Sequence, residues 1–228
     1  MRTSNSLRII GGVAVAVLLV AEQASAIIAY QNPSGNYGNQ PGDYVVGLQF
    51  TVGASPLSVT QLGAFDNGQN GWAAPVSVAI YNFTTHSIVG STATFSGTSG
   101  VNLGTLGSDG GSRFLPVTPF TLNAGQTYMV VAAGYGVGRE ENYNAGLPPS
   151  IALHQGAGIT VGNNYYTSGT GMLFPATMDA APYPRYGAGT FEFAPVPEAA
   201  QFAMAGVGLL GLVYIGRYAR LRRTMKLA

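Results

Sequence analysis

The segment Val76-Ser77-Val78-Ala79-Ile80-Tyr81 carries the clearest structural signal in this chain. Apolar side chains occupy every second position, so Val76, Val78 and Ile80 share one face of an extended backbone. A period of two is typical of a strand that has one face on a core, whereas a helix would need a period near 3.6. The segment therefore predicts a half-buried β-strand.

Similar short runs, rich in Val, Ile, Tyr, Phe and Thr, lie on both sides of it and are separated by Gly, Asn, Ser, Thr and Pro. In Asn123-Ala124-Gly125-Gln126, Gly125 is suited to the positive φ of a tight turn. These patterns predict an all-β fold, an antiparallel β-sandwich. The predicted strands are 44–52, 57–66, 76–82, 87–95, 114–117, 127–133, 151–153 and 190–193, with an irregular, loop-rich stretch at 134–189.

Composition narrows the function classes. The chain has 228 residues and no cysteine, which excludes disulfides, cysteine-ligated zinc and a cysteine nucleophile. Charged residues make up only 8% of it, and residues 27–196 hold three arginines against seven acidic residues. Nucleic-acid binding needs clustered Lys and Arg, so a nucleic-acid partner is not expected. The length suits one folded domain, which we place at residues 27–195.

The N-terminus has the three parts of a secretory signal peptide. Arg2 and Arg8 precede an apolar run at 9–21, and the small residues Ala24-Ser25-Ala26 follow it. We therefore expect residues 1–26 to be a cleaved signal helix and the rest to be exported. An uncleaved anchor is the alternative, but thirteen residues span about 20 Å as a helix against roughly 30 Å of hydrocarbon.

The C-terminus predicts a membrane helix. Residues 199–215 form an apolar run with Gln201 as its one strongly polar member. A basic cluster follows, which should remain cytoplasmic and stop transfer across the membrane. The cluster consists of Arg217, Arg220, Arg222 and Arg223. A buried core helix is the alternative, but it does not explain the arginines.

Val196-Pro197-Glu198 comes directly before this run, and residues 196–228 together resemble the PEP-CTERM sorting signal of Gram-negative bacteria. That signal combines a short Pro-Glu-Pro-like motif, a small-residue-rich helix and a basic end. Ala199 stands where the family usually has its second proline. The resemblance implies recognition by an exosortase, a membrane-embedded protease that cuts near the motif.

The central region is similar to uncharacterised extracellular β-sandwich modules found in PEP-CTERM proteins. The similarity spans about residues 40–193 and includes Leu62-Gly63-Ala64-Phe65-Asp66 and Leu122-Asn123-Ala124-Gly125-Gln126. It implies a jelly-roll-like sandwich and assigns no activity.

Catalytic and metal motifs are largely missing from the sequence. His86 and His154 are too few for a three-histidine zinc site, and no G-x-S-x-G motif occurs. We expect no catalytic residue and no cofactor. The alternative of a secreted polysaccharide hydrolase would depend on Asp66, Glu140, Glu141 and Asp179. Glu140 and Glu141 are neighbours, however, and are interpreted as a solvated charge pair.

Asp66-Asn67-Gly68-Gln69-Asn70-Gly71 partly resembles a calcium loop, with Asp66 and Asn70 as the candidate ligands. Gly68 removes the ligand at the third position, and the closing Glu is absent. An Asn/Gly turn between two strands is the favoured interpretation.

Aromatic residues in predicted loops are candidate glycan contacts, because flat rings can stack on sugars. The candidates are Trp72, Tyr165 and Tyr166. In the alternative interpretation, loop aromatics such as Tyr135, Tyr143 and Tyr186 cap the ends of the core.

The expected function is that of an exported, non-catalytic protein of the cell surface or extracellular matrix, associated with exopolysaccharide. Its expected partners are an exosortase, the membrane and exopolysaccharide. Besides the hydrolase, a permanently tail-anchored surface protein remains an alternative.

Overall fold

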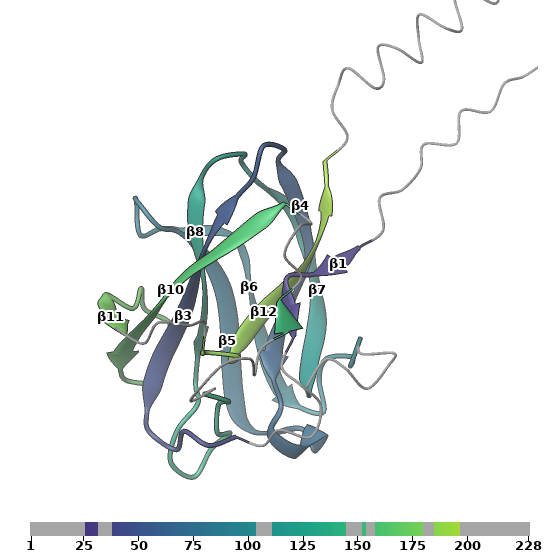
Figure 1. Cartoon of the computed structure of the whole chain (residues 1–228). Helices are drawn as coiled ribbons and strands as arrows, with labels where there is room; N and C mark the ends of the chain where they lie inside the picture. The colour runs from purple at the N-terminus through teal and green to yellow at the C-terminus, as the bar shows by residue number, and fades with distance from the viewer. Residues whose placement is uncertain are drawn as a thin grey trace, which may run out of the picture. The chain divides into compact units, whose positions relative to one another are not determined.

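A computed structural model describes residues 26–31, 38–103, 111–144, 152–153, 158–179 and 185–196. Ala24–Glu198 form one compact unit. Among its described residues the regular elements are strands and one short 3-10 helix, and the strands form two main antiparallel sheets and a two-stranded ribbon (Figure 1). No helix among these residues is long and apolar enough to cross a membrane. Residues 1–25 and 197–228, which include most of the predicted signal and the predicted membrane helix, lie outside the described part.

The smaller main sheet has four strands. In spatial order they are β1 (Ile27–Ile28), β12 (Gly189–Pro195), β4 (Leu57–Phe65) and β7 (Ser112–Leu122). Pairing of β4 with β12 and β7 is irregular at one point, between Val59 and Gln61. Thr60 is the extra residue opposite β12, so the side-chain alternation changes phase there. Val59 and Leu62 consequently both face the core.

The larger sheet has six strands. They are β11 (Thr177–Asp179), β10 (Ile159–Ser168), β3 (Tyr44–Val52), β8 (Thr127–Ala133), β5 (Trp72–Asn82) and β6 (Ile88–Gly97). The ribbon pairs β2 (Tyr30–Gln31) with β9 (Ala152–Leu153), and a short 3-10 helix, η1 (Asn67–Gln69), joins β4 to β5. The predictions for 44–52 and 127–133 match β3 and β8, and the prediction of a sandwich is confirmed.

One prediction is wrong for the region after residue 134, because β10 and β11 are regular strands within the stretch expected to be loop. Pairing between β10 and β3 shifts between Val161 and Asn164. Gly162 and Asn163 sit in this bulge, so the sequence loses its alternation although the strand continues.

The core fills the space between the two main sheets. Phe50 of β3 and Phe191 of β12 meet there with ring centroids 4.8 Å apart. Val76, Val78 and Ile80 are fully buried in the same cluster, as their spacing predicted. The turn after β7 also forms as expected, with Gly125 at φ +70°.

A second apolar cluster covers the opposite, outer face of the six-stranded sheet. It contains Val45, Ala79, Tyr81, Met129, Val131 and Ala133. The connection 169–176 between β10 and β11 reaches this face, since Pro175 lies against the backbone of Gly47 in β3. Half-buried side chains of Phe83, Tyr165, Met172 and Phe174 pack on the cluster.

The sheet edges differ from the interior strands. β7 is the edge of the four-stranded sheet and contains Pro116 and Pro119. β6 is an edge of the six-stranded sheet, and its pairing with β5 shifts at two places.

Candidate functional site

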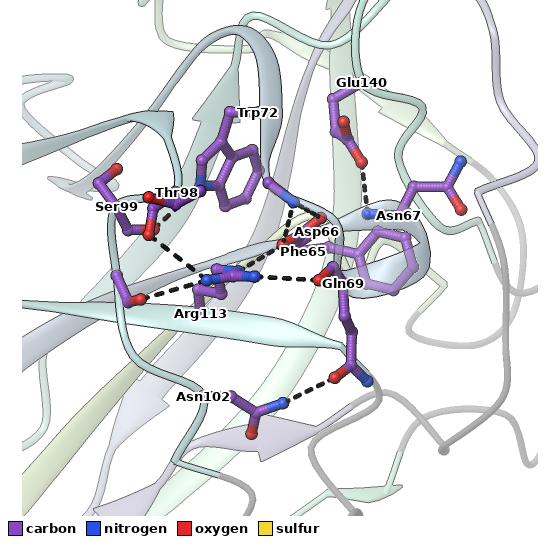
Figure 2. Close-up of polar contacts among 12 residues, drawn as sticks. Phe65, Asp66, Asn67, Gln69, Trp72, Thr98, Ser99, Asn102, Arg113 and Glu140 are labelled. Carbon is purple, nitrogen blue, oxygen red and sulfur yellow. Dashed lines mark hydrogen bonds and ion pairs between the residues drawn. The ribbon is translucent and has the colours of Figure 1, made fainter.

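A buried ion pair organises the loops where β4 ends. Asp66 follows directly on β4 and is 0% exposed, and the Nε atom of Arg113 in β7 donates to its Oδ2 atom (Figure 2). The two strands make this contact possible because Ala64, two residues before Asp66, pairs with Arg113. The amide of Gly71 donates to both carboxylate oxygens at 3.0 and 3.2 Å.

Arg113 also connects this turn to a neighbouring loop. One terminal nitrogen donates to the carbonyl of Gln69 at 3.0 Å, and the other approaches the carbonyls of Thr98 and Gly100 at 3.4 and 3.5 Å (Figure 2). The guanidinium therefore satisfies carbonyls from two loops and one buried carboxylate. This is the bonding of a structural clamp.

The clamp between Arg113 and Asp66 argues against the hypothesis that Asp66 and Asn70 bind calcium. Residues 67–69 form η1, with Gly68 at φ +79°, so the segment is a turn between two strands as favoured. Arg113 already supplies a positive charge to Asp66, and Asn70 is exposed. Among the described residues, no group of three or more His, Cys, Asp or Glu could hold a metal ion. Calcium would have to compete with Arg113 for the same carboxylate.

Glu140 is a second buried acid near Asp66. It is 5% exposed, and it accepts a hydrogen bond from the backbone amide of Asn67 (Figure 2). Burial raises the pKa of Glu140 from 4.5 to about 7, with smaller contributions from the charges of Asp66 and Glu141. The interpretation of Glu140 as part of a solvated charge pair is therefore wrong. Glu140 is buried, whereas its neighbour Glu141 is partly exposed.

The carboxyl groups named for a hydrolase are distributed between two places. Asp179 lies in β11, where it accepts a 2.7 Å hydrogen bond from the Tyr186 hydroxyl and forms a 3.4 Å ion pair with Arg185. Asp66 and Glu140 lie together, but Asp66 is fully enclosed and bound to arginine. The acids of this cluster hold loops in place, and neither carboxylate is open to a sugar bond.

Trp72 is not in a loop, which corrects its prediction as a glycan contact. It is the first residue of β5 and only 6% exposed; its indole nitrogen donates to the Ser99 carbonyl at 3.1 Å. Its ring packs against Phe95 with centroids 5.2 Å apart. The predicted loop position failed because Pro75 and an irregular pairing before Val76 hide the start of the strand.

Tyr165 and Tyr166 are adjacent in β10, so their side chains point to opposite faces of the sheet. Tyr166 packs edge-on to Tyr44, with centroids 6.0 Å apart, and belongs to the inner core. Tyr165 lies on the outer face. Tyr135 and Tyr186, which the alternative interpretation placed at the ends of the core, are 0% and 3% exposed.

Tyr165 belongs to an outer aromatic cluster that the sequence analysis missed. We define this cluster as Phe83, His86, Tyr165 and Phe174. Phe83 lies with its ring centroid 5.4 Å from Tyr165 and 5.9 Å from Phe174, and His86 stacks on Phe174 at 3.8 Å. The apolar run Met172-Leu173-Phe174 was the available signal, but it lay in the stretch interpreted as irregular.

Val196 is the one described residue of the predicted sorting segment. Its amide donates to the carbonyl of Pro56 at 3.0 Å. Pro197, Glu198, Arg217, Arg220, Arg222 and Arg223 lie outside the described residues.

Comparison of the sequence with known protein families and curated proteins found no match.

Proposed function

We propose that this chain is an exported, non-catalytic β-sandwich that a PEP-CTERM-like signal sends to the cell surface or extracellular matrix, where it associates with exopolysaccharide. The observation that carries the proposal is the three-part C-terminal sequence: Val196-Pro197-Glu198, the apolar run 199–215 and the arginine cluster. These parts follow directly on the last strand of a compact sandwich.

The strand order supports the finer assignment to a jelly-roll-like fold. With β10 and β11 set aside, the two sheets read β1-β12-β4-β7 and β3-β8-β5-β6. Successive strands of the chain change sheet at nearly every connection, as double-sheet jelly rolls do. Such a sandwich needs no disulfide and folds without cysteine in an exported location.

A non-catalytic role is favoured by how the acids are used. Asp66 is bound by Arg113, Asp179 by Arg185 and Tyr186, and Glu140 by a backbone amide. Association with glycan is supported by the outer aromatic cluster. Its flat rings suit apolar stacking against sugar rings.

The test is the intact mass of the protein from its own cells, measured separately in membrane and extracellular fractions. We expect a mature species that starts near Ile27 and ends near Val196 to Glu198. Recovery from membranes alone, with residues 217–228 still attached, would refute sorting and leave the permanently tail-anchored protein. A chain with Pro197→Ala and Glu198→Ala is the control, and it should accumulate with its basic end intact.

A further inference from the structure

The two ends of the sandwich domain lie on neighbouring strands. β1 pairs antiparallel with β12, with Ile27 opposite Phe193 and Ile28 opposite Glu192. In an antiparallel pair the chain enters one strand beside the point where it leaves the other. Figure 1 shows β1 and β12 adjacent in the four-stranded sheet. The predicted signal cleavage point, Ala26, and the start of the sorting segment therefore adjoin the same end of the domain.

Strand pairing continues up to the sorting motif. Pro195 pairs with Leu57 at the start of β4, and the amide of Val196 donates to Pro56. Neither Pro195 nor Pro197 has an N–H group, so Val196 carries the one backbone donor of Pro195-Val196-Pro197. That donor is already engaged by the folded domain.

No spacer separates this end from the predicted membrane segment. Three residue steps lead from Val196 to Ala199, which corresponds to about 11 Å when fully extended. A protease that acts on this motif would therefore cut only a few residues from the last paired strand.

The loops at this end are tied to one another. Gly125 donates to the carbonyls of Val52 and Gly53 at 3.0 Å, and Gly53 donates to Gly158 at 2.7 Å. The loops at 53–56 and 123–126 contain no charged residue. We call these two loops and Val196 the terminal surface.

We propose that cleavage of the sorting segment competes with the pairing of residues 194–196 to β4 at the terminal surface. Proteases bind substrate segments in extended form through backbone hydrogen bonds, and the amide of Val196 cannot serve both Pro56 and a protease. The protease must therefore act on an opened β12 end. This inference rests on the proposed sorting function, because it assumes that the tail is cut.

Two variants test the competition. The first places a six-residue Gly-Ser spacer between Val196 and Pro197, which frees the motif while β12 stays paired. The second is Ser58→Cys with Ala194→Cys, at positions that face each other across β4 and β12. Because the chain has no cysteine of its own, oxidation forms one disulfide and locks the end of β12.

Processing is followed by pulse–chase and intact mass in cells that make the protease. The spacer should raise the rate about fivefold to tenfold, the factor expected when one or two backbone hydrogen bonds no longer have to open first. The oxidised lock should lower the rate by at least a similar factor. Reduction of the same protein should restore it, and the two single-cysteine chains are controls. Thermal unfolding of each chain checks that it folds.

The outcomes separate this inference from the proposed function. If the natural chain is never cut, the sorting proposal fails. If the natural chain is cut and the spacer and lock variants are cut at its rate, the terminal surface does not control processing and this inference is overturned.

Discussion

The two faces of the six-stranded sheet are both apolar and buried, but different parts of the chain cover them. Its inner face meets the four-stranded sheet, and residues such as Phe50 and Ile80 are at most 2% exposed. Its outer face is covered by half-buried rings, beside Leu173 at 55% and Met178 at 53% exposure. The inner face therefore provides most of the stability, whereas the exposed apolar side chains lie on the outer covering.

Phe191→Ala should have the largest effect on stability. Phe191 is fully buried between the sheets, and its loss leaves a cavity that should lower the free energy of unfolding by about 3–5 kcal/mol. Phe174→Ala on the outer face should cost about 1 kcal/mol, because its ring is only half buried. Urea denaturation measures both. If both variants lost the same free energy of unfolding, the inner face would not contribute more to stability than the outer face.

Asp66→Asn tests the clamp in which Arg113 binds Asp66 at the end of β4. It leaves the Arg113 guanidinium without its carboxylate partner and should cost about 3 kcal/mol. Asp43→Asn is the matched control, since Asp43 is exposed and accepts a hydrogen bond from Val137 that an amide oxygen can also accept. The control should stay within about 0.5 kcal/mol. If Asp66→Asn left the free energy of unfolding unchanged, the loops would not depend on the ion pair.

Glu140→Gln should change how stability depends on pH. Because burial raises the pKa of Glu140 from 4.5 to about 7, the folded state holds this proton more tightly than the unfolded state. The stability it contributes is complete below about pH 4.5 and is lost as pH rises through about 7. We expect the variant to be about 1–2 kcal/mol more stable than the natural chain at pH 8.

Thermal and urea unfolding between pH 5 and pH 8 provide the measurement for Glu140. Glu141→Gln is the control, because Glu141 is the less buried neighbour. If Glu140→Gln keeps the natural slope between these pH values, another group causes the pH dependence.

Tyr165→Ala should have a small effect on stability and the clearest effect on binding. Tyr165 contacts Phe83 on the outer face, so its loss should cost about 1 kcal/mol of stability while weakening retention on glycan severalfold. The readout is affinity electrophoresis in gels that contain exopolysaccharide isolated from the producing cells. Tyr166→Phe, on the inner face, should bind as the natural chain does. Unchanged retention of Tyr165→Ala would remove the outer aromatic cluster from the proposed function.

The sequence predicted most of the strands before residue 134. β3 and β8 agree with their predicted limits, and the core face of β5 was identified residue by residue. β10 was missed because a bulge at Gly162 and Asn163 breaks the period of two, and the start of β5 was missed because Pro75 interrupts it. Local pattern therefore failed at these two irregularities, although it located β4 despite the extra residue Thr60.

The site was less predictable than the fold. Arg113 and Asp66 are 47 residues apart, and their contact depends on the alignment of β4 with β7, which no local pattern encodes. The same is true of the outer aromatic cluster, whose members come from the loop between β5 and β6, from β10 and from the connection after it. The sequence supplied Tyr165 but not its partners.

The edge strands β7 and β6 affect how copies of this domain can contact one another at high concentration. The matrix location proposed for this chain would place many identical copies side by side. Open strand edges on such copies invite edge-to-edge aggregation. Pro116 and Pro119 remove two backbone donors from the β7 edge, and the two shifts in pairing twist the β6 edge away from regular geometry. These features disfavour edge-to-edge pairing between copies of the domain at the β7 and β6 edges.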